Sequence, residues 1–228
     1  MKVCALSDIH GTLIPIEQFP TCELVCICGD ISPTKIQSNT KAVRKWLLNE
    51  FKPWCESINC DKILFIAGNH DFGLRRLDFM YEHFPKDGKI TYLFHEDYTY
   101  NSKDGKEYKI FGTPYCKIFG NWEFMKSNDE LRELYSQIPK DLDILMTHDQ
   151  PYEFGDVILQ NVPWNTGEHI GNEPLNECIF NKQPKILLCG HLHTTTHDCV
   201  MINDTKRYNV SIKDEYYYIA YNPLCLEI

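Results

Sequence analysis

The sequence predicts an α/β fold in which a mixed β-sheet sandwich is flanked by helices. Three features of the 228-residue chain indicate this architecture. Short apolar runs recur along the chain, segments with helical periodicity lie between them, and residues 199–228 alternate between apolar and polar side chains. Strands that alternate with helices are typical of α/β proteins, and an alternating segment is typical of antiparallel strands.

The apolar runs predict strands that are buried on both faces of a sheet. Each run is short and lacks the polar alternation of a half-exposed strand. Each run also ends in a small cluster of glycine and polar residues. The runs span residues 3–6, 24–28, 63–67, 144–146 and 186–189.

A first helix is predicted between the second and third runs. Ser38 or Asn39 has the side chain of a helix N-cap, and apolar residues follow at helical spacing as far as Phe51. Proline lacks the backbone N–H that a helix interior needs, so this helix is expected to end near Pro53.

Two further helices are predicted farther along the chain. Residues 74–84 place apolar side chains at steps of three and four residues, and this pattern ends before Pro85. Ser127 and Glu130 have the spacing of a capping box, which predicts a helix that begins there and stops at Pro139.

The chain is expected to form a single domain that spans residues 1–228. It shows no internal repeat and no linker-like segment. Its alternating tail is expected to fold as antiparallel strands around a turn at residues 203–206.

Composition excludes several classes of protein. Hydrophobic residues make up 43% of the chain, and the 12 glycines and 12 prolines are near ordinary usage, which excludes disordered and collagen-like chains. With 23 basic and 32 acidic residues the net charge is −9, so the chain lacks the basic patch of a protein that binds duplex nucleic acid. A metal centre can supply positive charge locally, which leaves phosphate-bearing substrates open.

The 11 cysteines are expected to be reduced. Their number is odd, the close cluster of Cys22, Cys26 and Cys28 has no matching second pair for a zinc site, and Cys4 and Cys189 lie in apolar runs. The first residues lack the apolar stretch of a signal peptide, and no run reaches the ~20 apolar residues of a membrane span. The sequence therefore predicts a cytoplasmic protein without a membrane segment.

Residue types that bind metals follow each of the five predicted strands. Because the carboxyl ends of parallel strands meet at one edge of a sheet, these side chains are expected to gather there. Carboxylates mixed with imidazoles suit Mn, Fe, Zn or Ni. They outnumber the ligands of one ion, so two ions with a shared carboxylate are expected, and Asp30 fits that position because it lies alone between two histidine-containing loops. In chain order, the residues are Asp8, His10, Asp30, Asn69, His70, Asp71, His148, His191 and His193.

Each motif also has a simple structural explanation. A single Asp-x-His pair is a weak signal, and a Gly-Asp or Gly-Asn pair after a strand is a common turn. His191 and His193 are more specific, because two imidazoles one residue apart are rarely needed for packing. The functional interpretation depends on the presence of all five motifs, each after a buried strand.

In order along the chain, the motifs DIH, GD, GNHD, TH and GHLH resemble the five-block signature of the calcineurin-like metallophosphoesterases. The segments GTPYCKIFGNWEF, ILMTHDQPYEFGD and GEHIGNEPL are similar to stretches of the metallophosphoesterase-domain-containing proteins. The chain departs from the protein phosphatase branch, in which a Val-Asp-Arg-Gly run continues the second block. Here Asp30 is followed by Ile31, Ser32 and Pro33, which counts against a phosphoserine phosphatase.

The resemblance implies a four-layer α/β/β/α fold and a pair of divalent transition-metal ions. Mn is the preferred metal, with Fe, Zn and Ni as alternatives, and Asp30 would bridge the two ions. One ion would be bound by Asp8, His10, Asp30 and His193, and the other by Asp30, Asn69, His148 and His191.

The resemblance places His70 outside both ligand sets, where it would touch the phosphate and protonate the leaving oxygen as the general acid. Asp71 or another acid would hold the His70 imidazole. The attacking group would be a hydroxide between the two ions, so no protein nucleophile is required. None of the cysteines lies in a motif that suggests one.

His169 and Trp122 are candidates for substrate contacts. His169 lies in one of the family-like segments, and the rings of Trp122, Tyr115 and Trp164 could stack on a nucleobase, although aromatic residues in such loops more often serve packing. The histidines interpreted as surface or structural residues are His83, His95 and His197.

The resemblance implies a dimetal-dependent phosphoesterase, and we favour a phosphodiesterase that acts on small diesters such as cyclic nucleotides. A phosphomonoesterase or a nuclease is the alternative enzyme, and the net charge of −9 disfavours the nuclease. The alternative outside the enzymes is a catalytically silent scaffold on the same fold that binds a partner protein. The intact set of metal ligands argues against that scaffold.

Overall fold

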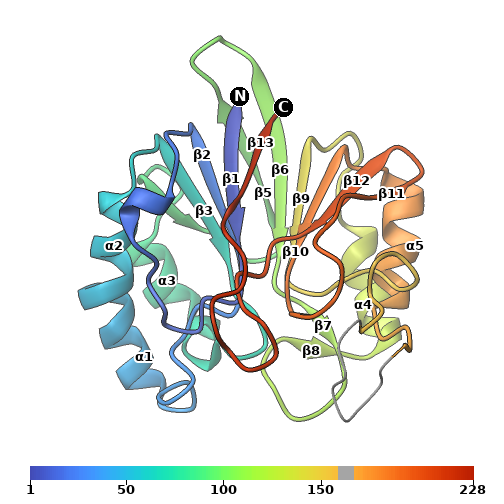
Figure 1. The fold of residues 1–228 in the computed structure, drawn as a ribbon, viewed down its shortest axis with the longest axis horizontal. Helices are drawn as coiled ribbons and strands as arrows, with labels where there is room; N and C mark the ends of the chain where they lie inside the picture. Colours follow the sequence, from blue (N-terminus) through green and yellow to red (C-terminus); the bar gives the residue numbers. More distant parts are fainter. Residues whose placement is uncertain (159–166) are drawn as a thin grey trace.

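The computed structural model describes residues 1–158 and 167–228. Two β-sheets face each other at its centre, and helices cover the outer face of each sheet (Figure 1). The layers therefore follow the order helices, sheet, sheet, helices, which confirms the α/β/β/α sandwich. Among the described residues, no helix is long and apolar enough to cross a membrane.

The first sheet has five strands in the order β13-β1-β2-β3-β4. Strands β1 to β4 are parallel, and β13 pairs with β1 in the antiparallel direction. The bounds are β1 Lys2–Leu6, β2 Leu24–Cys28, β3 Lys62–Ile66, β4 Ile90–Tyr92 and β13 Leu224–Glu227.

The second sheet has six strands in the order β11-β12-β10-β9-β6-β5. Its four central strands are parallel, and the two edge strands are antiparallel to their neighbours. The bounds are β5 Glu96–Asn101, β6 Glu107–Thr113, β9 Ile144–Thr147, β10 Ile186–Cys189, β11 Val200–Ile202 and β12 Thr205–Asn209. A separate short pair joins β7 Cys116–Lys117 to β8 Met125–Lys126.

Helices α1, α2 and α3 cover the first sheet, and α4 and α5 cover the second (Figure 1). The α-helices are α1 Thr40–Trp46, α2 Lys52–Ser57, α3 Leu77–His83, α4 Asn128–Ser136 and α5 Glu173–Lys182. Shorter helical turns are η1 Ile16–Gln18, η2 Leu47–Phe51 and η3 Phe72–Arg75.

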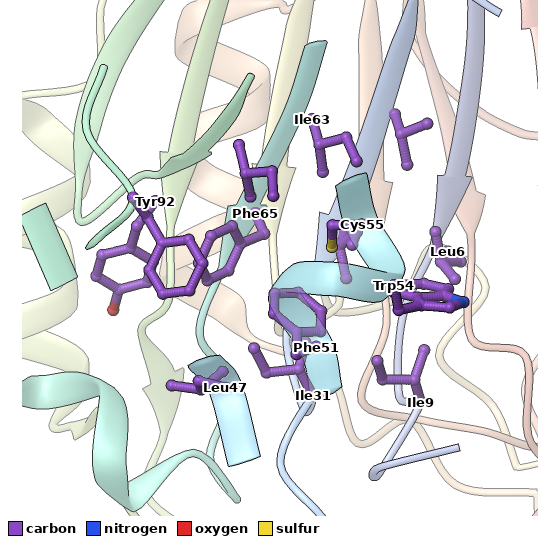
Figure 2. Packing of buried hydrophobic residues seen from close by; sticks show 14 of the residues in the cluster. Leu6, Ile9, Ile31, Leu47, Phe51, Trp54, Cys55, Ile63, Phe65 and Tyr92 are labelled. Atoms are coloured by element: carbon purple, nitrogen blue, oxygen red, sulfur yellow. The ribbon is translucent and has the colours of Figure 1, made fainter. Parts of the chain in front are cut away.

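The five predicted strands are confirmed as β1, β2, β3, β9 and β10, and all are buried on both faces. Successive side chains of one strand point to opposite faces of the sheet and so pack into different layers. In β2, Val25 and Ile27 face the helices, whereas Cys26 and Cys28 face the other sheet. On the helix side, Phe51 packs with Phe65 of β3 at a ring-centroid distance of 5.3 Å (Figure 2).

The first predicted helix begins as expected but does not end near Pro53. Asn39 is its N-cap and accepts the backbone N–H of Ala42 at 3.1 Å. The chain remains helical to Ser57 because the turn before the proline widens into the π-helical segment η2, in which the N–H of Lys52 donates to Leu47 O. A widened turn accommodates the proline ring and its missing N–H.

The other two predicted helices correspond to α3 and α4. Phe84 ends α3 directly before Pro85, and a 3₁₀ turn precedes the helix, so the apolar pattern covers two short elements. In α4, the side chain of Ser127 accepts the N–H of Glu130 while the Glu130 carboxylate accepts the N–H of Ser127. This reciprocal capping box confirms the predicted start of α4.

The prediction for the tail, residues 199–228, is correct in part. β11 and β12 form an antiparallel pair around residues 203–204. The chain then leaves the second sheet and returns as β13 beside β1 in the first sheet. The loop 210–223 therefore joins the two sheets, and it passes the carboxyl ends of their parallel strands at the bottom of Figure 1.

Candidate metal centre

Loops from both sheets meet at the carboxyl ends of β1, β2, β3, β9 and β10, where the predicted ligands lie. His148 follows β9 of the second sheet, and its Nδ1 donates to the carbonyl of Cys28 in β2 at 2.8 Å. The N–H of His10 donates to Asp30 O, and the N–H of Gly190 donates to His148 O. The one sheet edge expected from the sequence is therefore a junction between the edges of two sheets.

Asp30 lies at the centre of this junction. Its Oδ2 is 3.4 Å from His148 Nε2, 3.7 Å from His10 Nε2 and 3.9 Å from His70 Nε2. Its Oδ1 accepts the backbone N–H of His70 at 2.8 Å. A single buried carboxylate thus faces imidazoles from the loops after β1, β3 and β9, which is the position of a shared ligand.

Asp8 contacts the two histidines that follow β10. Together with Asp30 and the imidazoles around it, these residues form what we call the cluster. Asp8 Oδ1 is 3.3 Å from His193 Nε2, and the two Asp8 oxygens accept the N–H of His191 at 3.1 and 3.2 Å. Among residues 1–158 and 167–228, three overlapping groups of donor atoms could hold a metal ion, and the donor atoms of each group lie within 4.8 Å of one another. They are Asp8, His10 and His193; His10, Asp30 and His70; and Asp8, Asp30 and His148.

The donor atoms fit divalent metal ions. Both ring nitrogens of His10 are buried, and among the described residues neither has a hydrogen-bond partner. His148 donates from Nδ1 to Cys28 O and His193 from Nδ1 to Asp214 O, so in each the Nε2 atom is left to face the cluster. Such outer hydrogen bonds orient metal-binding histidines. Buried polar atoms normally have a partner, and a metal ion would supply one for His10.

Two of the histidines form charged pairs with the carboxylates. Burial disfavours the imidazolium of His148, but Asp30, Asp8 and the Cys28 carbonyl together outweigh burial and raise the pKa of His148 to about 10. Burial likewise opposes protonation of His193, and Asp8 nevertheless raises the pKa of His193 to about 9. These pairs neutralise the two buried carboxylates of the cluster.

Two further histidines of the cluster, His10 and His191, stay neutral. Burial lowers the pKa of His10 to about 3 and the pKa of His191 to about 4, and the nearby carboxylates offset burial only in part. A neutral imidazole is the form that binds a metal ion. His10 and His191 are therefore in that form already, whereas His148 and His193 would release protons on binding.

The backbone of the cluster is strained and tightly packed. Asp8, His10, Asp30 and His191 have positive φ angles of 57°, 43°, 51° and 68°, a region that residues other than glycine rarely adopt. A Cβ on Gly68 would overlap Asp30 Oδ1 and lie 2.6 Å from His148 Cε1. Only glycine lets the loop after β3 approach the others this closely, and strain of this kind collects at functional sites.

Gly190→Ala is expected to destabilise the protein and to weaken metal binding together. The new Cβ would overlap Ser7 Oγ and lie 2.5 Å from Asp8 Oδ2, so Asp8 would have to move. Overpacking of this kind costs about 1–3 kcal/mol. Urea denaturation and elemental analysis measure the two effects. Gly88→Ala is the control, because a Cβ there meets ordinary contacts of 3.4–3.5 Å.

Asn69 and His191 both lie beside His148. Asn69 Oδ1 is 3.0 Å from His148 Nε2, and the ring of His191 is 5.1 Å from that of His148. All seven residues expected to bind metal therefore come from loops that meet at this junction.

Asp71 does not hold the imidazole of His70. Its carboxylate accepts the backbone N–H groups of Gly68, Ile31 and Ser32 at 2.8–3.2 Å, and so it joins the loops after β2 and β3. The expectation that Asp71 orients His70 directly is corrected by these contacts. The partner of His70 Nδ1 is instead Gln37 Oε1 at 2.7 Å. The sequence carried no signal for Gln37, which lies in a segment without a motif.

Of the two substrate candidates, Trp122 lies at the cluster, with its ring centroid 4.3 Å from that of His70. His169 pairs with the buried Asp156 at 2.6 Å and lies against Tyr152. Among the described residues, no hydrogen bond or ring contact joins His169 to the metal cluster.

The remaining aromatic residues and histidines of the sequence analysis that the structure describes pack against neighbouring side chains. Tyr115 packs against Phe94 and His95, and His95 bonds Thr113 and Leu134 O. These contacts are those of a structural role for Tyr115 and His95. His197 stacks on the ring of Tyr221, and His83 packs on Phe79. Trp164 lies outside the described residues.

Comparison with protein families matches residues 1–195 to the calcineurin-like phosphoesterases. The chain is 28% identical over 211 residues to metallophosphoesterase domain-containing protein 1 of Homo sapiens, and the alignment covers 84% of this chain and 60% of that protein. It is 24% identical over 249 residues to a UPF0046 protein of Caenorhabditis elegans, with 94% and 58% covered. The chain thus spans about three fifths of the length of these relatives.

Solved structures share the fold at low sequence identity. One crystal structure superimposes with a TM-score of 0.68 at 14% identity and covers 91% of this chain and 89% of its own. TT1561 of Thermus thermophilus gives 0.55 at 15% identity, with 91% and 88% covered. GAP50, titled the anchor in the inner membrane complex of Plasmodium, gives 0.53 at 11% identity, with 93% and 71% covered.

Proposed function

Because the chain belongs to the calcineurin-like phosphoesterase family, we propose that it is a phosphodiesterase with two divalent transition-metal ions and that it hydrolyses small phosphodiesters such as cyclic nucleotides. The observation that carries this proposal is the position of Asp30. Its carboxylate faces His10 from the first sheet and His148 from the second, 3.7 and 3.4 Å away. A carboxylate between two sets of imidazoles is the arrangement that a two-metal site needs.

The same contacts support a division of the ligands between two ions. When bound, the two ions would lower the pKa of water and neutralise charge on the phosphate, with Mn as the preferred metal. Asp30 belongs to both sets. The first set is Asp8, His10, Asp30 and His193, and the second is Asp30, Asn69, His148 and His191.

We assign the proton transfer to His70. Its Nδ1 lies 2.7 Å from Gln37 Oε1, and an amide oxygen only accepts, so the Nδ1–H donates to Gln37. The Nε2 atom then faces the cluster and Asp30. In its doubly protonated form, the ring would keep its Nδ1–H on Gln37 and donate its Nε2 proton to the leaving oxygen, which returns the ring to the neutral Nδ1–H form.

The charge of the chain supports a small substrate. With a net charge of −9 and no basic block, the chain does not attract the backbone of a long nucleic acid. A phosphomonoesterase or a nuclease remains the alternative enzyme. A reducing, cytoplasmic location stays part of the proposal, because the number of cysteines is odd and most of them are buried.

A scaffold on the same fold is the alternative outside the enzymes. GAP50 is described as an anchor in the inner membrane complex of Plasmodium, and a fold alone does not decide between anchoring and catalysis. The difference has to come from the site. Here the carboxylates and imidazoles of both proposed ligand sets are present and face one another, which favours the enzyme.

Metal-free protein is expected to be inactive, and Mn²⁺ is expected to restore hydrolysis of diesters in preference to monoesters. The test compares stripped and Mn-loaded protein on model diesters, monoesters and cyclic nucleotides, with bound metal measured in parallel. Activity that survives complete removal of metal would exclude the two-metal mechanism. Protein that binds two ions but hydrolyses none of the esters would support the scaffold, and a preference for monoesters would overturn the diesterase.

A further inference from the structure

An aromatic side chain from the tail lies directly on the proposed metal cluster. The loop 210–223 brings the ring of Tyr217 to 4.7 Å from the ring of His10 and 5.4 Å from that of His193. The family match ends at residue 195, so the motifs of the family assign no role to Tyr217. Its loop passes the strand ends at which the cluster lies (Figure 1).

A hydrogen-bonded turn holds Tyr217 in this position. Asp214 Oδ1 accepts the N–H groups of Tyr216 and Tyr218 at 2.9 Å, and Asp214 O accepts the N–H of Tyr217 at 3.0 Å. The same carbonyl accepts Nδ1–H of His193 at 2.9 Å. The turn that presents Tyr217 is therefore tied to one of the proposed metal ligands.

The turn separates Tyr217 from its two neighbours. Tyr216 and Tyr218 are 70% and 72% exposed, whereas Tyr217 is 41% exposed and has a left-handed φ of 64°. A tyrosine rarely adopts that backbone conformation unless its surroundings impose it. Lys213 is a buried residue, and its ammonium lies 6.0 Å from the centre of the Tyr217 ring and donates to Thr12 Oγ1, which links the turn to the loop after β1.

In the described part of the chain, Tyr217 is one of three aromatic rings that contact imidazoles of the cluster. Trp122 lies against His70 at 4.3 Å, and Phe119, which is 49% exposed, lies against His191 at 5.0 Å. Tyr217 meets its two imidazoles at steep interplanar angles of 61° and 77°. It does not stack face to face on either of them, and it keeps surface open to solvent.

We propose that Tyr217 determines substrate specificity by stacking on a planar aromatic group, such as a nucleobase, attached to the phosphate that is cleaved. This inference deepens the proposed function and depends on it. An exposed aromatic ring beside a phosphate site attracts a base because every base has a π-face. The preferred diesters are then those in which a nucleoside is joined to the reacting phosphate.

The test measures binding, so that it does not depend on turnover. Mn-loaded protein is titrated with a nucleoside 5′-monophosphate and with ribose 5-phosphate, which lacks the base. Tyr217→Ala and Tyr217→Leu are expected to weaken binding of the nucleotide by ~10-fold, to leave binding of ribose 5-phosphate unchanged and to keep both ions. Tyr217→Phe should bind the nucleotide like the wild type. Tyr216→Ala is the control, because that ring is exposed on the same turn.

Three outcomes would overturn the role of Tyr217. An equal loss for both ligands would mean that the ring acts on the phosphate, and loss of metal in the leucine variant would mean that it supports the ligands. Unchanged binding would mean that it does neither. Failure of the proposed function looks different, because wild-type protein would then bind metal and hydrolyse no ester in the substrate comparison described above.

Discussion

Asp30→Asn is expected to reduce diester hydrolysis by ~10³-fold or more, since the two ions supply several kcal/mol of transition-state stabilisation. Metal content should fall with activity. Asp30 Oδ2 lies within 3.9 Å of His10, His70 and His148, so both proposed sites share this carboxylate. An amide is neutral and cannot bridge two cations as a carboxylate does.

The asparagine variant removes the negative charge of Asp30 but keeps the shape of its side chain. Its side-chain oxygen can still accept the N–H of His70, which Asp30 Oδ1 now accepts at 2.8 Å. Elemental analysis and steady-state kinetics give the result. Asp156→Asn is the matched control, because it removes another buried carboxylate whose side-chain partners are His169 and Gly171. An Asp30→Asn protein that holds both ions at normal affinity would show that Asp30 is not the bridge.

The sequence predicted the parallel strands well because their signal is local. A strand covered on both faces needs apolar side chains at every position, and such runs stand out along the chain. No local sequence pattern indicates which of the two sheets each of these strands joins. Val25 faces the helices and Cys26 faces the other sheet, yet both are simply apolar in sequence.

The pairing of β13 was missed, although the tail was expected to form antiparallel strands. β13 pairs with β1 across almost the whole chain, with Cys225 opposite Cys4, and no local pattern predicts that partner. The β5–β6 hairpin, which was also missed, does have a local signal. Asp104 and Gly105 separate two strands in which buried and exposed side chains alternate, and Asp-Gly between alternating runs is typical of a hairpin.

The metal-binding residue types were predictable because each follows a strand directly, so the fold brings them to one place. Their supporting contacts were not, because these depend on how loops pack on one another. Gln37 reaches His70 from a segment with no motif, and Asp71 bonds amides of two other loops. The alternating pattern of the tail predicts a strand at Tyr217, whereas a turn centred on Asp214 presents this residue to the cluster.

His70→Ala is expected to lower hydrolysis by ~10²–10⁴-fold, the range for loss of a general acid, while both metal ions remain bound. The loss should depend on the leaving group. An alkoxide such as a ribose oxygen leaves poorly without a proton, so the variant should fail on a cyclic nucleotide. A nitrophenolate leaves largely unaided, so the variant should keep more of its activity on an aryl ester.

Gln37→Ala tests whether His70 acts through a fixed orientation. Within the described part of the chain, the Gln37 amide bonds His70 Nδ1 and none of the proposed ligands, so its removal should leave metal content unchanged. We expect a smaller loss than in His70→Ala, with the same dependence on the leaving group. His83→Ala serves as the control for loss of a histidine, since His83 lies at the end of α3 and packs on Phe79.

The structure also makes the rival explanation for His70 testable. His70 Nε2 lies 3.9 Å from Asp30 Oδ2, within the group of donors formed with His10, so His70 is close enough to be a ligand itself. If His70→Ala loses metal in proportion to activity, His70 is a ligand and the proton transfer belongs elsewhere. If metal stays and both classes of ester slow by the same factor, His70 stabilises charge on the phosphate instead. Only retained metal together with a larger loss on the alkyl leaving group assigns the proton to His70.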